Sequence, residues 1–227
     1  MKRFRVILLV AISLAFLQEV SGQGFVNLDF EDTSITPVLM NYYSGYYDYI
    51  ATVPGWTWTP QFNSAAVNPY TTVSLNDIAL DSPAVTLHSA ADPYGLQTIE
   101  GNYSIFLQGG SPILPSSSYS AIWQTGQIPL TAQSLIYWGG AFQIAFNEQI
   151  LAPFAIGNGS KYTIWAADIS AFAGQSGQLR FTCSWKNSGF LDNIQFSSTT
   201  VPEPDTFALT ALGATLLGFR RWQNSSR

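Results

Sequence analysis

Apolar and polar residues alternate with a period of two along much of the chain between residues 23 and 200. The clearest alternation covers residues 178–186, where successive side chains would point to opposite faces of a strand. One face is apolar and the other polar: Leu179, Phe181, Cys183 and Trp185 against Arg180, Thr182, Ser184 and Lys186. This pattern predicts a half-buried strand of an antiparallel sheet.

The same signal recurs in short runs that are separated by turn residues. Alternation predicts strands at 26–31, 142–147 and 162–167, and β-branched and aromatic residues favour strands at 103–108, 119–128, 134–138 and 190–196. Turn signals such as Pro54-Gly55 and Gly139-Gly140 punctuate these runs. Residues 168–174 fit one helical turn or a corner between strands. The sequence therefore predicts an all-β fold, a single antiparallel β-sandwich of the jelly-roll kind over residues 23–200.

The N-terminal 22 residues have the three parts of a secretory signal peptide. A basic start, Lys2, Arg3 and Arg5, precedes the twelve-residue apolar run 6–17 and a short polar region with small residues. Twelve residues rise about 18 Å as a helix, too little for a hydrocarbon core of about 30 Å. We expect signal peptidase to cleave after Gly22, with an uncleaved N-terminal anchor as the alternative.

The C-terminal end, residues 201–227, combines a proline motif, an apolar run and a basic cluster. Val201-Pro202-Glu203-Pro204 precedes the fourteen residues 206–219, and Arg220 and Arg221 follow. This run is shorter than the usual membrane span of about 20 residues.

In this order, the motif resembles the PEP-CTERM sorting signal of Gram-negative bacteria. The resemblance implies a sorting helix that anchors the protein transiently in the inner membrane until an exosortase processes it. It also implies a final location at the cell surface or in the matrix of species that form biofilms and exopolysaccharide. Six residues, 222–227, follow the arginines here, whereas family tails often end within them.

The net charge of the predicted domain argues against one class of binding partner. Hydrophobic residues make up 47% of the whole chain and charged residues only 10%. Residues 23–200 hold eleven acidic and three basic residues, a formal net charge of −8. An acidic surface repels phosphate backbones, so the composition argues against nucleic-acid binding.

Two short segments near the ends of the domain resemble galactose-binding-like jelly rolls, the fold of non-catalytic carbohydrate-binding modules. They are Asn27-Leu-Asp-Phe-Glu31 and the closing Leu191-Asp-Asn-Ile194, with Pro54-Gly55-Trp56 and residues 168–181 between them. The resemblance implies a candidate structural calcium held by Glu31 and Asp192, since related folds use one carboxylate near the first strand and one near the last. The alternative is that Asp192, expected on the same face as Ile194 and Phe196, accepts hydrogen bonds from backbone amides.

Aromatic residues are dense between positions 42 and 58 and supply candidate sugar contacts. Aromatic faces stack on the apolar faces of sugar rings. The candidates are Tyr43, Tyr46, Tyr47 and Trp58. The alternative is that these rings are core or cover an edge of the sandwich, with at least one of Trp56 and Trp58 buried.

The sequence offers little for catalysis. His88 is the only histidine and Cys183 is the only cysteine. Cys183 is expected on the apolar face of the predicted strand at 178–186, and so in the core. Gly174-Gln-Ser-Gly177 lacks the spacing of a nucleophile elbow. A glycosidase pair among the eleven acids stays open, because sequence does not report carboxylate separation. We therefore expect an exported, non-enzymatic surface or matrix protein; the second interpretation is a carbohydrate-binding module acting on exopolysaccharide, and the third a surface hydrolase.

Overall fold

A computed structural model of the chain describes residues 24–39, 47–61, 70–77, 81–92, 95 and 98–201. Within this part the secondary structure is almost entirely β, as the alternation predicts, with one short 3₁₀ turn, η1 (Ser170–Phe172), in the segment expected to be a helical turn or corner. The predicted signal peptide at 1–22 and the apolar segment 206–219 lie outside the described residues.

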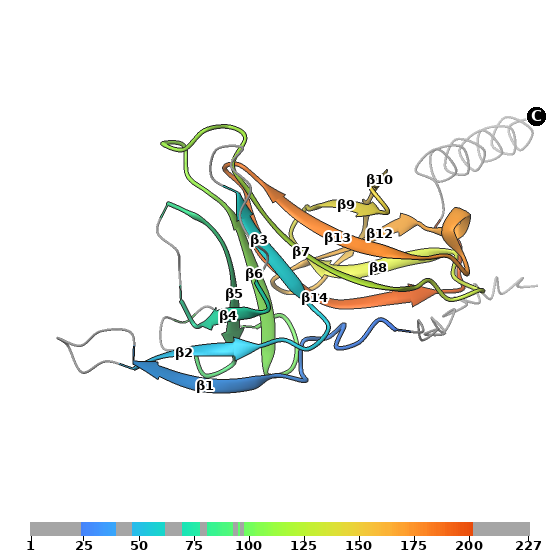
Figure 1. The fold of residues 1–227 in the computed structure, drawn as a ribbon. Coiled ribbons are helices and arrows are strands. Elements are labelled where there is room, and N and C mark those ends of the chain that lie inside the picture. Colours follow the sequence, from blue (N-terminus) through green and yellow to red (C-terminus); the bar gives the residue numbers. More distant parts are fainter. Residues whose placement is uncertain are drawn as a thin grey trace, which may run out of the picture.

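Two sheets pack face to face as the layers of a sandwich (Figure 1). The larger sheet holds, in spatial order, β1 (Ser34–Leu39), β2 (Tyr47–Thr52), β4 (Thr72–Leu75), β5 (Pro83–Ser89), β6 (Tyr103–Gly109), β14 (Ser188–Ser197), β8 (Ser134–Gly139), β12 (Thr163–Asp168) and β11 (Phe154–Asn158). The smaller sheet holds β10 (Gln149–Leu151), β9 (Gln143–Phe146), β13 (Ser176–Ser184), β7 (Tyr119–Gln127) and β3 (Thr57–Gln61). The fold class predicted from the sequence is confirmed.

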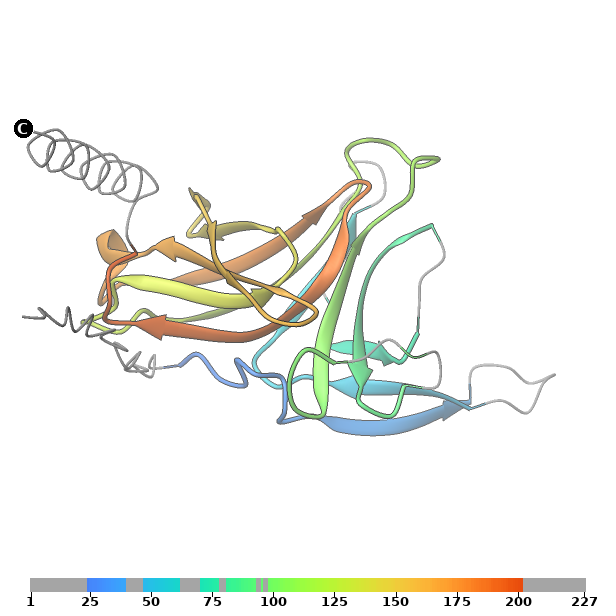
Figure 2. The ribbon, with the colours of Figure 1, turned by 180° about the vertical axis from the view of Figure 1, so that it is seen from behind.

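The order of strands departs from a simple meander. Strands β13 and β14 are consecutive in the chain but lie in different sheets, as do β6 and β7. Figure 2 shows β8 and β14 of the larger sheet from the side opposite to Figure 1. One pair of the described strands, β4 and β5, is parallel, whereas the sequence led us to expect antiparallel pairing throughout.

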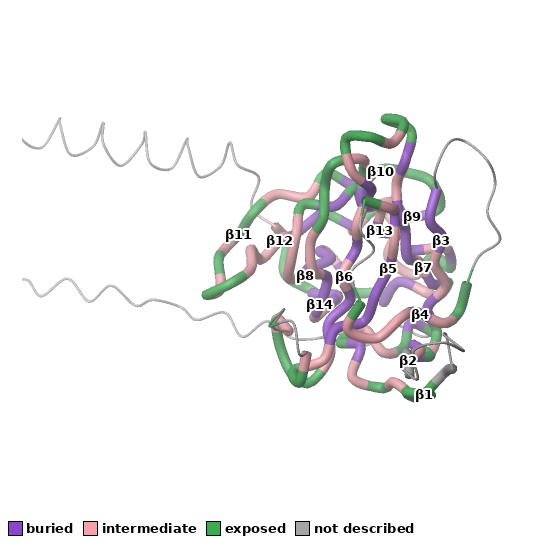
Figure 3. Tube along the Cα trace, turned by 90° about the vertical axis from the view of Figure 1, so that its left-hand side faces the viewer, coloured by how far each residue is buried: buried purple, intermediate pink, exposed green. Residues whose placement is uncertain are grey.

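The core lies between the sheets, where Trp56 is packed between aromatic rings from distant parts of the chain. Its ring centroid lies 5.3 Å from that of Phe30 and 6.4 Å from that of Phe181 on β13. The indole nitrogen of Trp56 donates to the backbone oxygen of Asn27 over 2.9 Å, so the buried ring keeps its polar atom satisfied. Buried positions concentrate between the sheets, and exposed ones gather in loops and edge strands (Figure 3).

The predicted strand at 26–31 is wrong. Asn27 and Phe30 have positive φ values of 50° and 59°, and the Phe30 amide donates to the Asn27 oxygen over 3.3 Å. Such left-handed backbone forms turns rather than pleated strand. The alternation does not match the burial of this segment either, because Phe30 is fully buried whereas Val26, which a strand would place on the same face, is 48% exposed.

The prediction that Asp192 shares a face with Ile194 and Phe196 is also wrong. The pairing of β14 with β8 shifts register between Asp192 and Gln195, which marks a bulge. A one-residue shift moves a side chain to the opposite face of a sheet. The side chain of Asp192 therefore points away from the inter-sheet core. It accepts a hydrogen bond from Ser104 of β6 on the outer side of the larger sheet.

Candidate functional site

The two predicted calcium ligands line the same groove, at the junction between the N-terminal segment, the loop before β6 and the bulge of β14. Its volume is about 610 Å³. The lining residues are Phe25, Asn27, Leu28, Asp29, Glu31, Glu100, Gly101, Asp192, Asn193, Ile194, Gln195 and Phe196. The fold thus places Glu31 and Asp192 in one groove, although they are far apart in the chain.

Glu31 connects the N-terminal segment to the loop before β6. Its Oε1 accepts hydrogen bonds from the backbone amides of Asn102 (2.8 Å) and Tyr103 (2.9 Å), and its Oε2 accepts one from Asn102 Nδ2 (3.0 Å). Gly101 permits this approach, since a Cβ there would lie 2.2 Å from Glu31 Oε1 and φ is +58°. The carboxylate therefore acts as a latch between two distant segments.

Asp192 is only 1% exposed and is held by protein donors on both oxygens. Its Oδ2 accepts from the hydroxyl of Ser104 over 2.5 Å, and its Oδ1 accepts from the Asn193 amide over 2.7 Å. The pKa of Asp192 is raised to about 7, chiefly because burial disfavours the charged form. The charge of Glu100 also raises this pKa, whereas hydrogen bonds from Ser104 and from the backbone amides of Asn193 and Glu100 lower it.

This arrangement favours the acceptor role of Asp192 over calcium binding. Calcium takes six to eight oxygens, usually from several carboxylates. In the described part of the chain no three metal-ligating side chains converge, and every oxygen of Glu31 and Asp192 already accepts a hydrogen bond. The calcium hypothesis stays a prediction: it requires a melting temperature that rises in millimolar calcium and falls again with a chelator.

The predicted sugar-binding aromatics are not brought together as an exposed surface by the described residues. Trp58 on β3 is half-buried, stacks on Tyr70 with centroids 4.9 Å apart, and donates from its indole nitrogen to the Thr72 oxygen over 2.7 Å. Trp56 is 3% exposed, which confirms that at least one of the two tryptophans is core. Tyr43 and Tyr46 lie outside the described residues, and so does the side chain of Tyr47 at the start of β2.

A different aromatic surface lies on the outer face of the smaller sheet, formed by β3, β7, β13 and β9. Cross-strand pairing aligns its side chains in rows that run from strand to strand. The rows are Thr57–Trp123–Arg180–Ala145, Thr59–Ala121–Thr182–Gln143 and Gln61–Tyr119–Ser184. We call these eleven residues the sheet face; its hydroxyl, amide and aromatic groups include no carboxylate.

Arg180 is fixed in the middle of the sheet face. Its guanidinium carbon lies 4.8 Å from the ring centroid of Trp123 and 5.8 Å from that of Tyr119. Arg180 is paired with Trp123, whereas Tyr119 is two rows away, so the side chain leans along β13 between the two rings. Ala121, which lies between Tyr119 and Trp123 on the same face, is fully covered.

The alternation in β13 correctly predicts that Arg180 points away from the core, but the sequence reasoning missed Trp123 and Tyr119. In β7 both faces carry apolar side chains, because Ile122 faces the core between Ala121 and Trp123. Period-two alternation therefore does not mark an outer face there. The only signal in the sequence is the aromatic content of residues 119–128.

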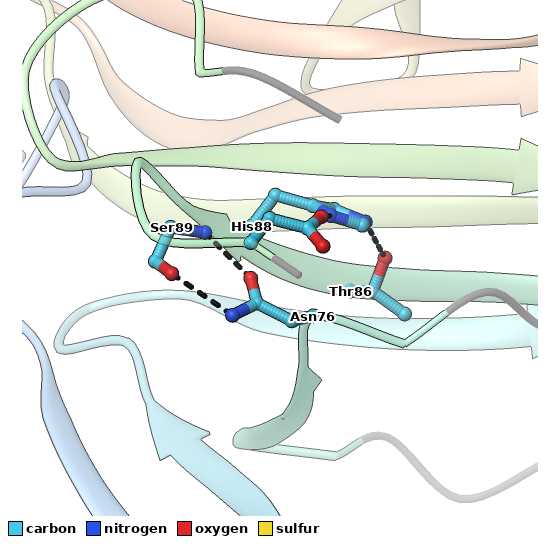
Figure 4. A network of polar contacts seen from close by, with 5 residues as sticks. Asn76, Thr86, His88 and Ser89 are labelled. Carbon is cyan, nitrogen blue, oxygen red and sulfur yellow. Dashed lines mark hydrogen bonds and ion pairs between the residues drawn. The ribbon is translucent and has the colours of Figure 1, made fainter. Parts of the chain in front are cut away.

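A buried polar network surrounds His88 on the outer side of the larger sheet (Figure 4). His88 Nδ1 lies 2.6 Å from Asp92 Oδ2, and Nε2 lies 3.2 Å from the hydroxyl of Thr86. Asn76 bonds both the amide and the hydroxyl of Ser89 alongside, over 2.7 and 2.9 Å.

The hydroxyl, imidazole and carboxylate of this network follow the order of a catalytic triad. However, His88 is fully buried and Thr86 is 4% exposed, so a substrate would not reach the hydroxyl. The rings of Phe106 and Phe190 pack edge-on against His88, with centroids 5.6 and 5.5 Å away. This geometry fits a structural role that ties β5 to the loop after it.

Cys183 is the only cysteine of the chain and lies on the core side of β13, as the alternation predicts. It is 1% exposed, and burial raises the pKa of its thiol to about 12. Its sulfur donates to the backbone oxygen of Asn187 over 3.1 Å. A thiol in this setting stays protonated and packs as a small apolar group.

The sorting motif falls almost wholly outside the described part of the chain. Val201 is its last described residue, and Pro202, Glu203, Pro204, Arg220 and Arg221 lie beyond it. Among the residues that the structure describes, no helix is long and apolar enough to cross a membrane.

Comparisons with known proteins add little to this picture. No protein-family model and no curated protein matches the chain. Among solved structures, the chain is similar to the enzymatically active domain of tailspike protein 4 of bacteriophage CBA120, with a TM-score of 0.35 and 13% identity. The match covers 63% of this chain and 19% of that chain, so this protein corresponds to less than a fifth of the tailspike domain's length. A TM-score this low carries no argument about the site.

Proposed function

We propose that the β-sandwich is a polysaccharide-binding domain of an exported surface protein, and that the sheet face is its binding surface. The observation that carries this proposal is the pair of partly exposed rings, Trp123 and Tyr119, on one carboxylate-free face of the sheet. Flat aromatic and hydroxyl-rich surfaces suit extended sugar chains, because rings contact C–H faces and polar side chains bond hydroxyls. The side chains of Thr57, Thr182 and Gln143 supply such polar groups.

The location of these rings supports a binding role rather than a core role. Fully buried aromatic rings, such as Phe181, point between the sheets, whereas Trp123 and Tyr119 alternate away from them. Exposing aromatic rings to water has a cost of about 25 cal/mol for each Å² of apolar surface. A face that keeps two such rings partly exposed is therefore a candidate contact surface.

Affinity electrophoresis of the full chain in mild detergent, through gels that contain neutral and acidic polysaccharides, tests the proposal. We expect retardation by at least one polysaccharide, and we expect Trp123→Ala to abolish it. Tyr70→Ala is the matched control, because Tyr70 is 43% exposed but lies on Trp58, away from the sheet face. If Tyr70→Ala lost the retardation and Trp123→Ala kept it, the binding site would lie at Trp58 and Tyr70 and not on the sheet face.

The destination of the protein is a second part of the proposal and rests on the sequence. The signal-peptide pattern and the order Val201-Pro-Glu-Pro204, apolar run, arginines support export and exosortase sorting. Because proline disfavours helix at its own position and at the one before it, we expect the motif to be accessible to a membrane protease. In a host with an exosortase, replacing Pro202, Glu203 and Pro204 with alanine should retain a longer, membrane-bound form. Release of this variant as fast as the wild type would reject sorting and leave an ordinary hydrophobic anchor.

A further inference from the structure

Arg180 is the only acidic or basic side chain in the five strands of the smaller sheet. Its Nε donates to the Thr182 hydroxyl over 3.4 Å. Among the described residues, its terminal nitrogens make no hydrogen bond and no ion pair. Four N–H donors of the guanidinium therefore remain available on a face where the side chain is already held by two rings.

The guanidinium has the shape that a carboxylate requires. Arginine presents its donors in a rigid planar fork that binds both oxygens of a carboxylate at once, which a lysine ammonium does not do. Contact with the rings of Trp123 and Tyr119 limits the rotamers of Arg180. A ligand that binds there therefore loses less of its binding free energy to ordering this long side chain.

The local charge of the sheet face is opposite to that of the whole domain. Residues 23–200 carry a formal net charge of −8, yet the strands around Arg180 contain no Asp or Glu. At physiological ionic strength the Debye length is about 8 Å, so carboxylates beyond that distance act weakly on a ligand at Arg180. An anionic group is thus attracted to this point, and the two other basic residues of the domain, Lys161 and Lys186, lie outside the sheet face.

We propose that the sheet face selects polysaccharides that contain uronic acids. Arg180 binds the carboxylate of one sugar through its terminal nitrogens, and the neighbouring sugars contact the exposed parts of Trp123 and Tyr119. This inference rests on the proposed function, since it names the class of polysaccharide that the same face binds. The discriminating group is the negative charge of the sugar carboxylate, and not the sugar backbone.

A polyuronate and its methyl ester test this selectivity, because esterification removes the charge and keeps the backbone. With the full chain in detergent, we expect polygalacturonate to bind at least ten-fold more tightly than its fully methyl-esterified form. Arg180→Gln should remove this preference, because it should weaken the binding of polygalacturonate to the level that the same variant shows for the ester. Arg180→Lys, which keeps the charge but loses the fork, should retain only part of the preference.

Lys161→Gln is the matched control, because it removes one positive charge from the hairpin between β11 and β12 of the larger sheet. It should bind both polymers as the wild type does. Equal binding of the two polymers by the wild type would overturn the selectivity and leave polysaccharide binding intact. The selectivity would also be overturned if the preference survived in Arg180→Gln or disappeared in Lys161→Gln. If the wild type bound neither the ester, nor the polyuronate, nor dextran, the proposed function would be rejected as well.

Discussion

Strands β13 and β14 follow each other in the chain and each carries one charged residue, but the two residues have opposite surroundings. Asp192 on β14 is buried and both its oxygens accept hydrogen bonds from the protein. Arg180 on β13 is partly exposed, and among the described residues its terminal nitrogens have no hydrogen-bond or ion-pair partner. A group whose polar atoms are all hydrogen-bonded within the fold has none left for a ligand, whereas a fixed group with free donors is available to one.

The same contrast extends to the outer faces of the two sheets. On the larger sheet, Thr86, His88, Ser104 and Asp192 are each less than 5% exposed and bond to one another or to adjacent loops. On the smaller sheet, Trp123 and Arg180 stay partly open to solvent. Substitutions on the first face should therefore change folding, and substitutions on the second should change binding.

The largest effect that we expect concerns the pH dependence of stability through Asp192. Burial raises its pKa in the folded state to about 7, from 3.8 in the unfolded chain, so the folded protein binds more protons between these values. The free energy of unfolding should therefore fall as pH rises through this window, by up to about 1.4 kcal/mol per pH unit. Urea denaturation at a series of pH values measures this slope.

Two variants isolate the contribution of Asp192. Asp192→Asn is neutral throughout, so its stability should lose this slope between about pH 4 and pH 7. Ser104→Ala removes a donor that lowers the pKa, so the slope should extend above pH 7. A slope that is the same in the wild type and Asp192→Asn would show that Asp192 does not titrate in this range.

A smaller loss of stability is expected when the Glu31 latch is removed. Glu31→Ala deletes three hydrogen bonds to a charged acceptor and should lower the free energy of unfolding by about 1–3 kcal/mol, because water partly replaces them. Asp32→Ala is the control, since Asp32 is exposed next to Glu31 and only its backbone atoms are hydrogen-bonded among the described residues. Equal stability of both variants in urea would mean that the latch contributes nothing.

The smallest change in stability is expected at Arg180. Arg180→Gln removes one weak hydrogen bond and two ring contacts at a half-exposed position, so stability should change by no more than about 0.5 kcal/mol. Thermal unfolding monitored by circular dichroism compares it with the wild type. A loss of several kcal/mol would mean that Arg180 serves the stability of the fold, and the contrast between Arg180 and Asp192 would be wrong.

The sequence predicted the class of fold because period-two alternation is a direct consequence of burial on one side of a sheet. It succeeded at β13, where Leu179, Phe181 and Cys183 are all buried. It failed at residues 26–31, where burial of Phe30 is achieved by a left-handed turn. Val26 alternates with the buried Phe30 in the sequence but is exposed, so an alternation of residue types by itself shows neither a strand nor which side chains are buried.

The candidate site was harder to predict because it depends on register. The sequence indicated that Arg180 points outward, but its meeting with Trp123 follows from the pairing of β13 with β7. Asp192 was expected on the face of Ile194, and a bulge that leaves no clear mark in the sequence moved it. Glu31 and Asp192 line one groove, but the hydrogen bonds that engage them come from Asn102, Tyr103 and Ser104, and their shared calcium ion stays a prediction.

The central claim is that the sheet face binds the sugar chain, and ¹⁹F NMR of the full chain labelled with 5-fluorotryptophan tests it most directly. The chain contains seven tryptophans, and Trp123→Phe identifies the signal of Trp123 by removing it. On titration with polyuronate oligosaccharides, we expect the Trp123 signal to shift while that of buried Trp56 stays in place. An unchanged Trp123 signal, together with a shift at Trp58 or at no tryptophan, would contradict the account.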